Sequence, residues 1–210
     1  MRIMINENAE MRNDNNMRNN GTHEVNEALP EYKRYTYADY CTWGDEERWE
    51  LIDGVPYAMS APSQAHQEAF GVLFNQLYNY LKGKHCKVFA APFDVRLNYD
   101  TGDDTVVQPD LLVVCDKAKL DEKGCNGAPD MVIEILSPST ARHDRFVKFR
   151  LYQKYGVREY WIVDPETKTV QAHVLDEGRF YTTIYADTDD IQVHVLEGCT
   201  INLVGVFNQL

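Results

Sequence analysis

Two apolar segments that each carry one carboxylate constrain this chain more than any other feature of its sequence. Asp110 begins the aliphatic run of residues 106–114, and Glu134 lies inside the run of residues 129–137. Successive side chains of a strand point to opposite faces, so Glu134 shares a face with aliphatic neighbours. An ionised carboxylate there is costly unless a cation, a metal or a proton compensates it. The pattern predicts two buried strands whose acids need a partner.

Two acids on neighbouring apolar strands are typical of a divalent-metal site. Mg²⁺ takes oxygen ligands and is usually bound through one or two carboxylates, so we expect Asp110 and Glu134 to hold Mg²⁺ or Mn²⁺. The alternative is that both are strand-end acids whose charge is satisfied by backbone N–H groups or arginines. The chain has no phosphate-binding glycine loop, serine nucleophile elbow or HExxH zinc motif.

A predicted helix at residues 140–155, ended by Gly156, supplies a third candidate. On a helical wheel Lys148 and Asp144 fall inside the apolar arc. The lysine is then either the i, i+4 partner of Asp144 or a cation directed at a buried acidic site, and the two interpretations are compatible.

Other polar side chains are accessory candidates. His66 lies on the inward stripe of a helix, where a hydrogen-bonded core histidine is the favoured interpretation. Asp94 shares a strand face with Arg96, so the two either border the site or pair with each other.

The remaining pattern predicts one domain preceded by an extension. Residues 1–28 hold seven Asn among the first twenty positions and too few apolar residues to pack, so we expect a disordered extension before a domain at 29–210. The expected elements are a short helix after Thr36, a hairpin at 49–59 around Asp53-Gly54, a helix from Ser63 to Gly83, strands at 87–99, 106–114 and 130–136, the helix at 140–155, and strands at 159–164, 168–175, 178–185 and 192–196. This order predicts an α/β fold with a central mixed sheet flanked by helices and additional antiparallel strands, not a Rossmann repeat.

Charge and cysteine content bear on partners and compartment. The net charge of −12 repels nucleic acid at long range. Close to a site, a local basic surface or bound cations override this repulsion. The five cysteines are odd in number and show no zinc spacing, which favours a reducing cytoplasm. No apolar run is long enough for a membrane helix, so we expect a cytoplasmic protein without a membrane partner.

An ordered series of motifs resembles the Uma family (Uma-two) of restriction endonucleases, which belongs to the PD-(D/E)xK nuclease superfamily. The resemblance covers roughly residues 35–200 and rests on Gln108-Pro109-Asp110-Leu111-Leu112-Val113-Val114, on Pro129-Asp130-Met131-Val132-Ile133-Glu134-Ile135-Leu136-Ser137-Pro138-Ser139-Thr140, and on Asp144, Lys148 and Tyr152 followed by residues 155–165. It implies a restriction-endonuclease-like fold.

The resemblance also implies roles for individual residues. Asp110 and Glu134 would be the metal ligands, with the carbonyl of Ile135 as a further ligand. The superfamily pattern places a lysine two residues after the second acid, where this chain has Leu136. In this family the lysine lies on the following helix, which indicates Lys148.

The same resemblance extends to the hairpin and to the activity. Glu50 is similar to the family's N-terminal acid and is an accessory candidate, with a surface acid as the alternative. The implied activity is metal-dependent hydrolysis of nucleic-acid phosphodiesters, DNA first, with a homodimer left open. A nuclease-fold binding module without useful catalysis, which the acidic charge favours, and a hydrolase of smaller phosphate esters are the competing hypotheses.

Overall fold

The computed structural model describes residues 33–44 and 48–208, and the extension predicted for residues 1–28 lies outside them. Its centre is a six-stranded mixed sheet in the order β11-β10-β9-β8-β6-β3. Its strands are β3 (Lys87–Ala90), β6 (Leu111–Val114), β8 (Met131–Ile135), β9 (Glu159–Asp164), β10 (Thr169–Asp176) and β11 (Arg179–Ala186). Strands β8 and β9 are parallel, and the other neighbours in this sheet are antiparallel.

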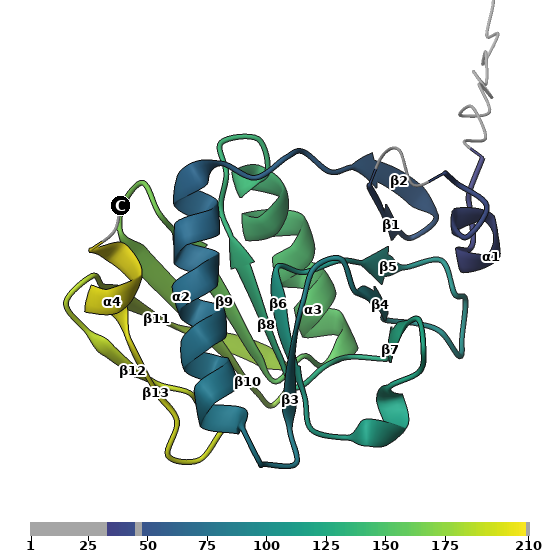
Figure 1. Ribbon diagram of the computed structural model, residues 1–210. Coiled ribbons are helices and arrows are strands. Elements are labelled where there is room, and N and C mark those ends of the chain that lie inside the picture. Colours follow the sequence, from purple (N-terminus) through teal and green to yellow (C-terminus); the bar gives the residue numbers. More distant parts are fainter. Residues whose placement is uncertain (1–32, 45–47, 209–210) are drawn as a thin grey trace, which may run out of the picture. The chain divides into compact units, whose positions relative to one another are not determined.

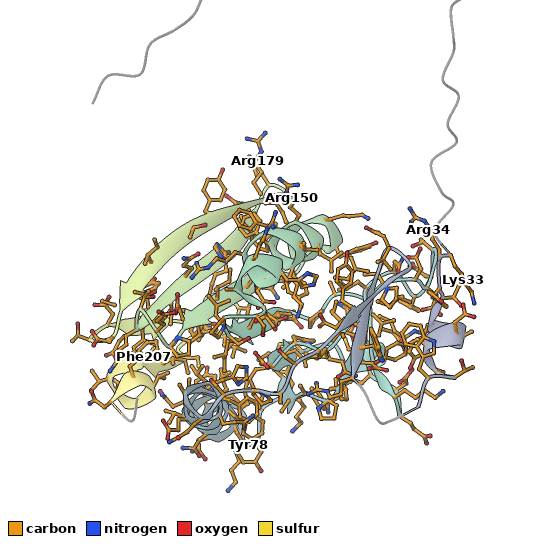
Figure 2. All side chains as sticks on the ribbon, turned by 90° about the horizontal axis from the view of Figure 1, so that it is seen from above. Lys33, Arg34, Tyr78, Arg150, Arg179 and Phe207 are labelled. Carbon is orange, nitrogen blue, oxygen red and sulfur yellow. A yellow bond between two sulfur atoms is a disulfide. The ribbon has the colours of Figure 1, made fainter. Side chains whose placement is uncertain are left out.

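Helices cover both faces of this sheet. Helix α2 (Gln64–Leu81) lies in front of it and α3 (Phe149–Tyr155) behind it (Figure 1). Figure 2 shows Tyr78 of α2 and Arg150 of α3 projecting from opposite sides. Along β8, alternate side chains join two different cores, with Met131 and Ile133 packed with α2 and Val132 packed with α3. Because Glu134 follows the same alternation as Val132, it faces the α3 side.

A second sheet has five short strands in the order β2-β1-β5-β4-β7. Its strands are β1 (Trp49–Ile52), β2 (Val55–Ala58), β4 (Asp94–Arg96), β5 (Val106–Val107) and β7 (Gly124–Asn126). The remaining elements are α1 (Tyr37–Tyr40), a 3₁₀ turn at Lys117–Lys119, the pair β12 (Asp190–Gln192) and β13 (Thr200–Asn202), and α4 (Leu203–Phe207). The predicted mixed sheet with flanking helices and extra antiparallel strands is thus confirmed.

The expected starts of the first two helices are confirmed. Thr36 caps α1 through a reciprocal capping box with Asp39, and the side chain of Ser63 accepts the backbone N–H of His66 at the start of α2. The hairpin turn at Asp53-Gly54 is also present, and both residues have positive φ angles, as such a turn requires.

Two segments predicted as single strands each feed both sheets. Residues 87–99 form β3 in the central sheet and β4 in the second one, with the cis bond before Pro92 between them. Residues 106–114 divide into β5 and β6 around Pro109, which has no N–H to give to a ladder. Asp110 therefore lies where the chain crosses from one sheet to the other.

Other predictions were incomplete. The helix expected at 140–155 begins as a π-helix at His143–Lys148 and continues as α3. The strand expected at 192–196 is wrong beyond Gln192, because β12 ends there and pairs with the unpredicted β13.

The cysteines form a pair that their spacing did not indicate. Cys86 and Cys115 are joined by a disulfide across 29 positions of sequence. They flank the register pair Lys87 and Val114 of the β3–β6 ladder, so strand pairing brings them together. Among the described helices, none is long and apolar enough to cross a membrane.

Candidate active site

The sequence-predicted acids and lysine meet in one cleft of about 360 Å³. Its walls come from the β1–β2 hairpin, the start of α2, the ends of β6 and β8, and the π-helix. The lining includes Arg48, Glu50, His66, Asp110, Glu134, Ile135, His143, Asp144 and Lys148. Asp94 is the one accessory candidate that does not line this cleft.

Lys148 is the centre of the buried charge network. Its Nζ lies 2.9 Å from an oxygen of Glu50, 2.9 Å from Oε1 of Glu134 and 3.6 Å from Oδ1 of Asp144. Burial disfavours the ammonium, but the three carboxylates outweigh burial and hold the pKa of Lys148 well above its usual value. Both interpretations of this lysine are therefore met, because it pairs with Asp144 and also faces the acidic site.

Glu134 is buried on the strand face that the alternation predicts. Its Oε1 accepts hydrogen bonds from Lys148 Nζ at 2.9 Å and from the Tyr152 hydroxyl at 2.7 Å. Burial raises the pKa of Glu134 and Lys148 opposes that rise. The carboxylate thus depends on this lysine for its negative charge.

Asp110 is held by two donors on one oxygen. Its Oδ2 accepts the backbone N–H of Ile135 at 2.8 Å and lies 3.0 Å from Nε2 of His66. His66 is buried and hydrogen-bonded, as the core interpretation predicted, but its partner is a residue of the cleft. The histidine therefore fixes the orientation of Asp110.

Glu50 belongs to the site rather than to the surface. Its side chain is only 4% exposed, and Oε1 accepts the backbone N–H of Gln108 at 2.9 Å. Its Oε2 lies 3.9 Å from Nε2 of His143. The alternative of a surface acid is wrong, since the hairpin turns this carboxylate inward.

Three carboxylates of the cleft each keep one oxygen that accepts no hydrogen bond within the described part of the chain. These oxygens are Oδ1 of Asp110, Oε2 of Glu134 and Oε2 of Glu50. Anionic oxygens of this kind are the ligands that Mg²⁺ prefers. The donor chemistry therefore fits a divalent ion.

The spacing of ligand atoms limits the form of such a site. Within residues 33–44 and 48–208, the only trio of histidine, cysteine or acidic ligand atoms within 4.8 Å of one another is His85, Cys86 and Cys115, and its two cysteines form the disulfide. The three acids of the cleft do not converge so closely. Mg²⁺ is commonly bound through one or two carboxylates and completed by water, so such an ion would need only two of the three acids.

Sequence reasoning missed a second layer of polar contacts behind the cleft. Arg48 donates from Nε at 3.1 Å and from Nη2 at 2.8 Å to Oε1 of Gln108. The Nε2 of Gln108 donates to Asp94 at 2.9 Å and to the Tyr40 hydroxyl at 2.9 Å. Asp94 thus supports the residue that anchors Arg48, whereas Arg96 pairs with Asp103.

No periodicity could have revealed these contacts, because Arg48 and Gln108 are 60 positions apart. The run 106–109 carried one usable signal, a glutamine among aliphatic residues. A buried amide needs partners for its oxygen and its nitrogen.

Comparison with known proteins gives the family of this chain. The model of the Uma2 family, described as "Putative restriction endonuclease", matches residues 30–204. The chain belongs to the Uma2 family. The resemblance found in the motifs is thereby confirmed.

Individual relatives agree with this assignment. The Uma2 chain is 27% identical over 159 residues to "Uncharacterized protein slr1290" of Synechocystis sp. (strain ATCC 27184 / PCC 6803 / Kazusa), covering 74% of this chain and 82% of that protein. A crystal structure of "a putative nuclease belonging to DUF820" from Anabaena variabilis ATCC 29413 matches with a TM-score of 0.68 at 18% identity, covering 83% of this chain and 98% of that one. This likeness shows a common fold.

Proposed function

We propose that this Uma2 protein is a metal-dependent endonuclease that hydrolyses phosphodiester bonds of DNA. The observation that carries the proposal is a set of three carboxylate oxygens beside a buried lysine in one cleft, none of which accepts a hydrogen bond from residues 33–44 or 48–208. Family membership supports the nuclease class.

The acids of the cleft and the groups that orient them have separate roles in this proposal. Asp110 and Glu134 would hold Mg²⁺ or Mn²⁺, with the carbonyl of Ile135 as a further ligand. When bound, the ion supplies positive charge for the phosphate oxygens and lowers the pKa of a water. His66 and the Ile135 N–H keep Asp110 in one orientation, which leaves its Oδ1 for the ion.

The lysine and the arginine supply the remaining positive charge. Lys148, held between Glu50 and Glu134, would stabilise negative charge that develops on the phosphate in the transition state. Arg48, fixed by two hydrogen bonds to Gln108, would bind a phosphate oxygen of the substrate. These cations act at short range and oppose the unfavourable field of a chain with net charge −12.

The test compares two buried glutamates. Glu134→Gln should slow single-turnover cleavage of a labelled DNA in Mn²⁺ by about 10²-fold or more, since the ligand charge is lost. Glu159→Gln is the matched control, because Glu159 is also buried and its pKa is also raised by burial, yet it bonds Trp161 and Val195 outside the cleft. Equal rates for both variants would contradict the proposal.

A second measurement does not need catalysis. Mn²⁺ should raise the melting temperature of the wild type, as any ligand of the native state does, and Asp110→Asn should abolish the rise. A wild type that binds DNA and cleaves none over a broad substrate screen would instead support the binding-module hypothesis, which the acidic charge favours.

A further inference from the structure

A cationic segment borders the cleft of this acidic chain. Residues 139–158 contain six Lys and Arg against a single Asp, whereas the whole chain has a net charge of −12. Lys148 is buried, and Arg145 pairs with Asp164 at 2.7 Å. Arg142 and Arg150 are exposed and have no ion-pair partner among the residues that the structure describes. Their charge is therefore available to an anionic partner.

An exposed aromatic side chain lies between these two arginines. Phe146 is 61% exposed, and its neighbour Val147 is 36% exposed. Arg142, Phe146 and Arg150 follow one another at intervals of four, which places them along one side of the helical segment. Figure 2 shows Arg150 projecting away from the body of the protein. We call these three residues the outer row.

The outer row leads into the cleft. A shallow groove beside it is lined by Ser139, Arg142, His143, Phe146 and Val147. Ser139 and His143 also line the cleft that holds Asp110 and Glu134. A chain lying in this groove would therefore continue toward the carboxylates.

We infer that the outer row binds an unpaired stretch of nucleic acid, with Phe146 stacked on a base and the two arginines on the flanking phosphates. The inference rests on the proposed function, because it names the form of the substrate that enters the same cleft. Guanidinium groups complement phosphates in charge and in geometry.

Two physical arguments favour an unpaired strand over a duplex. A phenyl ring stacks on a base only where the base has a free face, and the bases inside a duplex are already stacked on both sides. A duplex also carries about twice the charge per unit length of a single strand, so a chain this acidic repels it more strongly. Two exposed arginines and one aromatic ring match the lower charge density of a single strand better than that of a duplex.

Binding can be measured separately from cleavage. The probes are a fluorescent single-stranded DNA and its duplex, with Ca²⁺ in place of Mg²⁺ and anisotropy as the readout. The wild type should bind the single strand more tightly, and Phe146→Ala should weaken that binding about tenfold. Tyr181→Ala is the matched control, since Tyr181 is 60% exposed on β11 and lines neither the cleft nor the groove.

The arginines give an independent readout. Arg142→Gln should reduce the slope of log affinity against log salt by about 0.7, because one phosphate contact is lost. Arg34→Gln, which changes an exposed arginine well away from Arg150 in Figure 2, should leave the slope unchanged. Phe146→Trp should restore the binding that Phe146→Ala loses.

Several results would overturn the inference. One is equal affinity of Phe146→Ala and wild type for the single strand, and another is tighter binding of the duplex than of the single strand. A third is that Phe146→Ala alters the sedimentation coefficient but not the affinity for DNA, which would make the outer row a contact between two copies of the chain. Metal-dependent cleavage with Phe146→Ala as active as wild type on single strands would remove the inference and keep the endonuclease. Phe146-dependent binding without any cleavage would remove the endonuclease and keep the inference.

Discussion

Replacing Lys148 by Met tests the centre of the cleft. The substitution removes the ammonium that lies 2.9 Å from both Glu50 and Glu134 and leaves three buried carboxylates without their cation. Removing one partner of a buried ion pair lowers the free energy of unfolding by about 3–5 kcal/mol. Because a domain of this kind is stable by about 5–15 kcal/mol in total, about a fifth or more of that stability should disappear.

The loss should depend on pH in a defined direction. Burial raises the pKa of Glu134, and without Lys148 it rises further. The folded variant then binds a proton that the unfolded chain releases at an ordinary glutamate pKa, so its stability falls as pH rises through that window. Urea unfolding at about pH 5.5 and about pH 8 should therefore show the larger deficit at the higher pH. Mn²⁺ should recover part of it by restoring positive charge.

A matched lysine completes the experiment. Lys154 has a side chain that is 59% exposed and pairs with Asp53 at 3.5 Å, so Lys154→Met should cost less than about 1 kcal/mol. Equal losses for the two variants would refute the reasoning about buried charge. Single-turnover cleavage by Lys148→Met should also drop about 10²-fold or more. Retention of the wild-type rate in a folded variant would restrict this lysine to a structural role.

Three further predictions concern other parts of the molecule. Burial lowers the pKa of His173 from 6.5 to about 4, so between these pH values the chain takes up a proton when it unfolds, and its stability falls as pH drops. His173→Phe should make the free energy of unfolding, measured with urea, less dependent on pH in this range; an unchanged pH dependence would contradict the prediction. Gln108→Ala should slow cleavage about as much as Arg48→Ala, and the double variant should show no further loss if the glutamine acts through the arginine. Reducing the Cys86–Cys115 disulfide, which spans 29 positions, should lower the free energy of unfolding by about 3–4 kcal/mol, as melting with and without reductant would show.

The sequence predicted those parts of the fold that depend on local periodicity and capping. Helix α2 begins after Ser63 because the serine hydroxyl accepts a backbone N–H, and the hairpin turns at Asp53-Gly54 because both residues adopt positive φ. The alternation along β8 also predicted which face Glu134 occupies. Such signals lie within a few residues of one another, so one chain suffices to find them.

Other features depend on partners that are distant in the chain. Strands β3 and β4 are separate because they pair with different neighbours. Strand β3 pairs with β6, whereas β4 pairs with β5 and β7. The wheel drawn for residues 140–155 assumed an α-helix, but His143–Lys148 is a π-helix with more residues per turn. The link from Arg48 through Gln108 to Asp94 joins three separate strands or strand ends and leaves no periodic trace.

The division of the strands between two sheets gives the cleft a mechanical property. Glu50 is on β1 of the second sheet and Glu134 on β8 of the central sheet, and a single ammonium bridges them. If the two sheets moved apart at the cleft, both of these short ion pairs would lengthen at once. Lys148 therefore resists separation of the two sheets at this point. A bound cation that contacted the carboxylates of both Glu50 and Glu134 would resist this separation in the same way. The rigidity of the β1–β8 contact would then depend on whether that cation is bound.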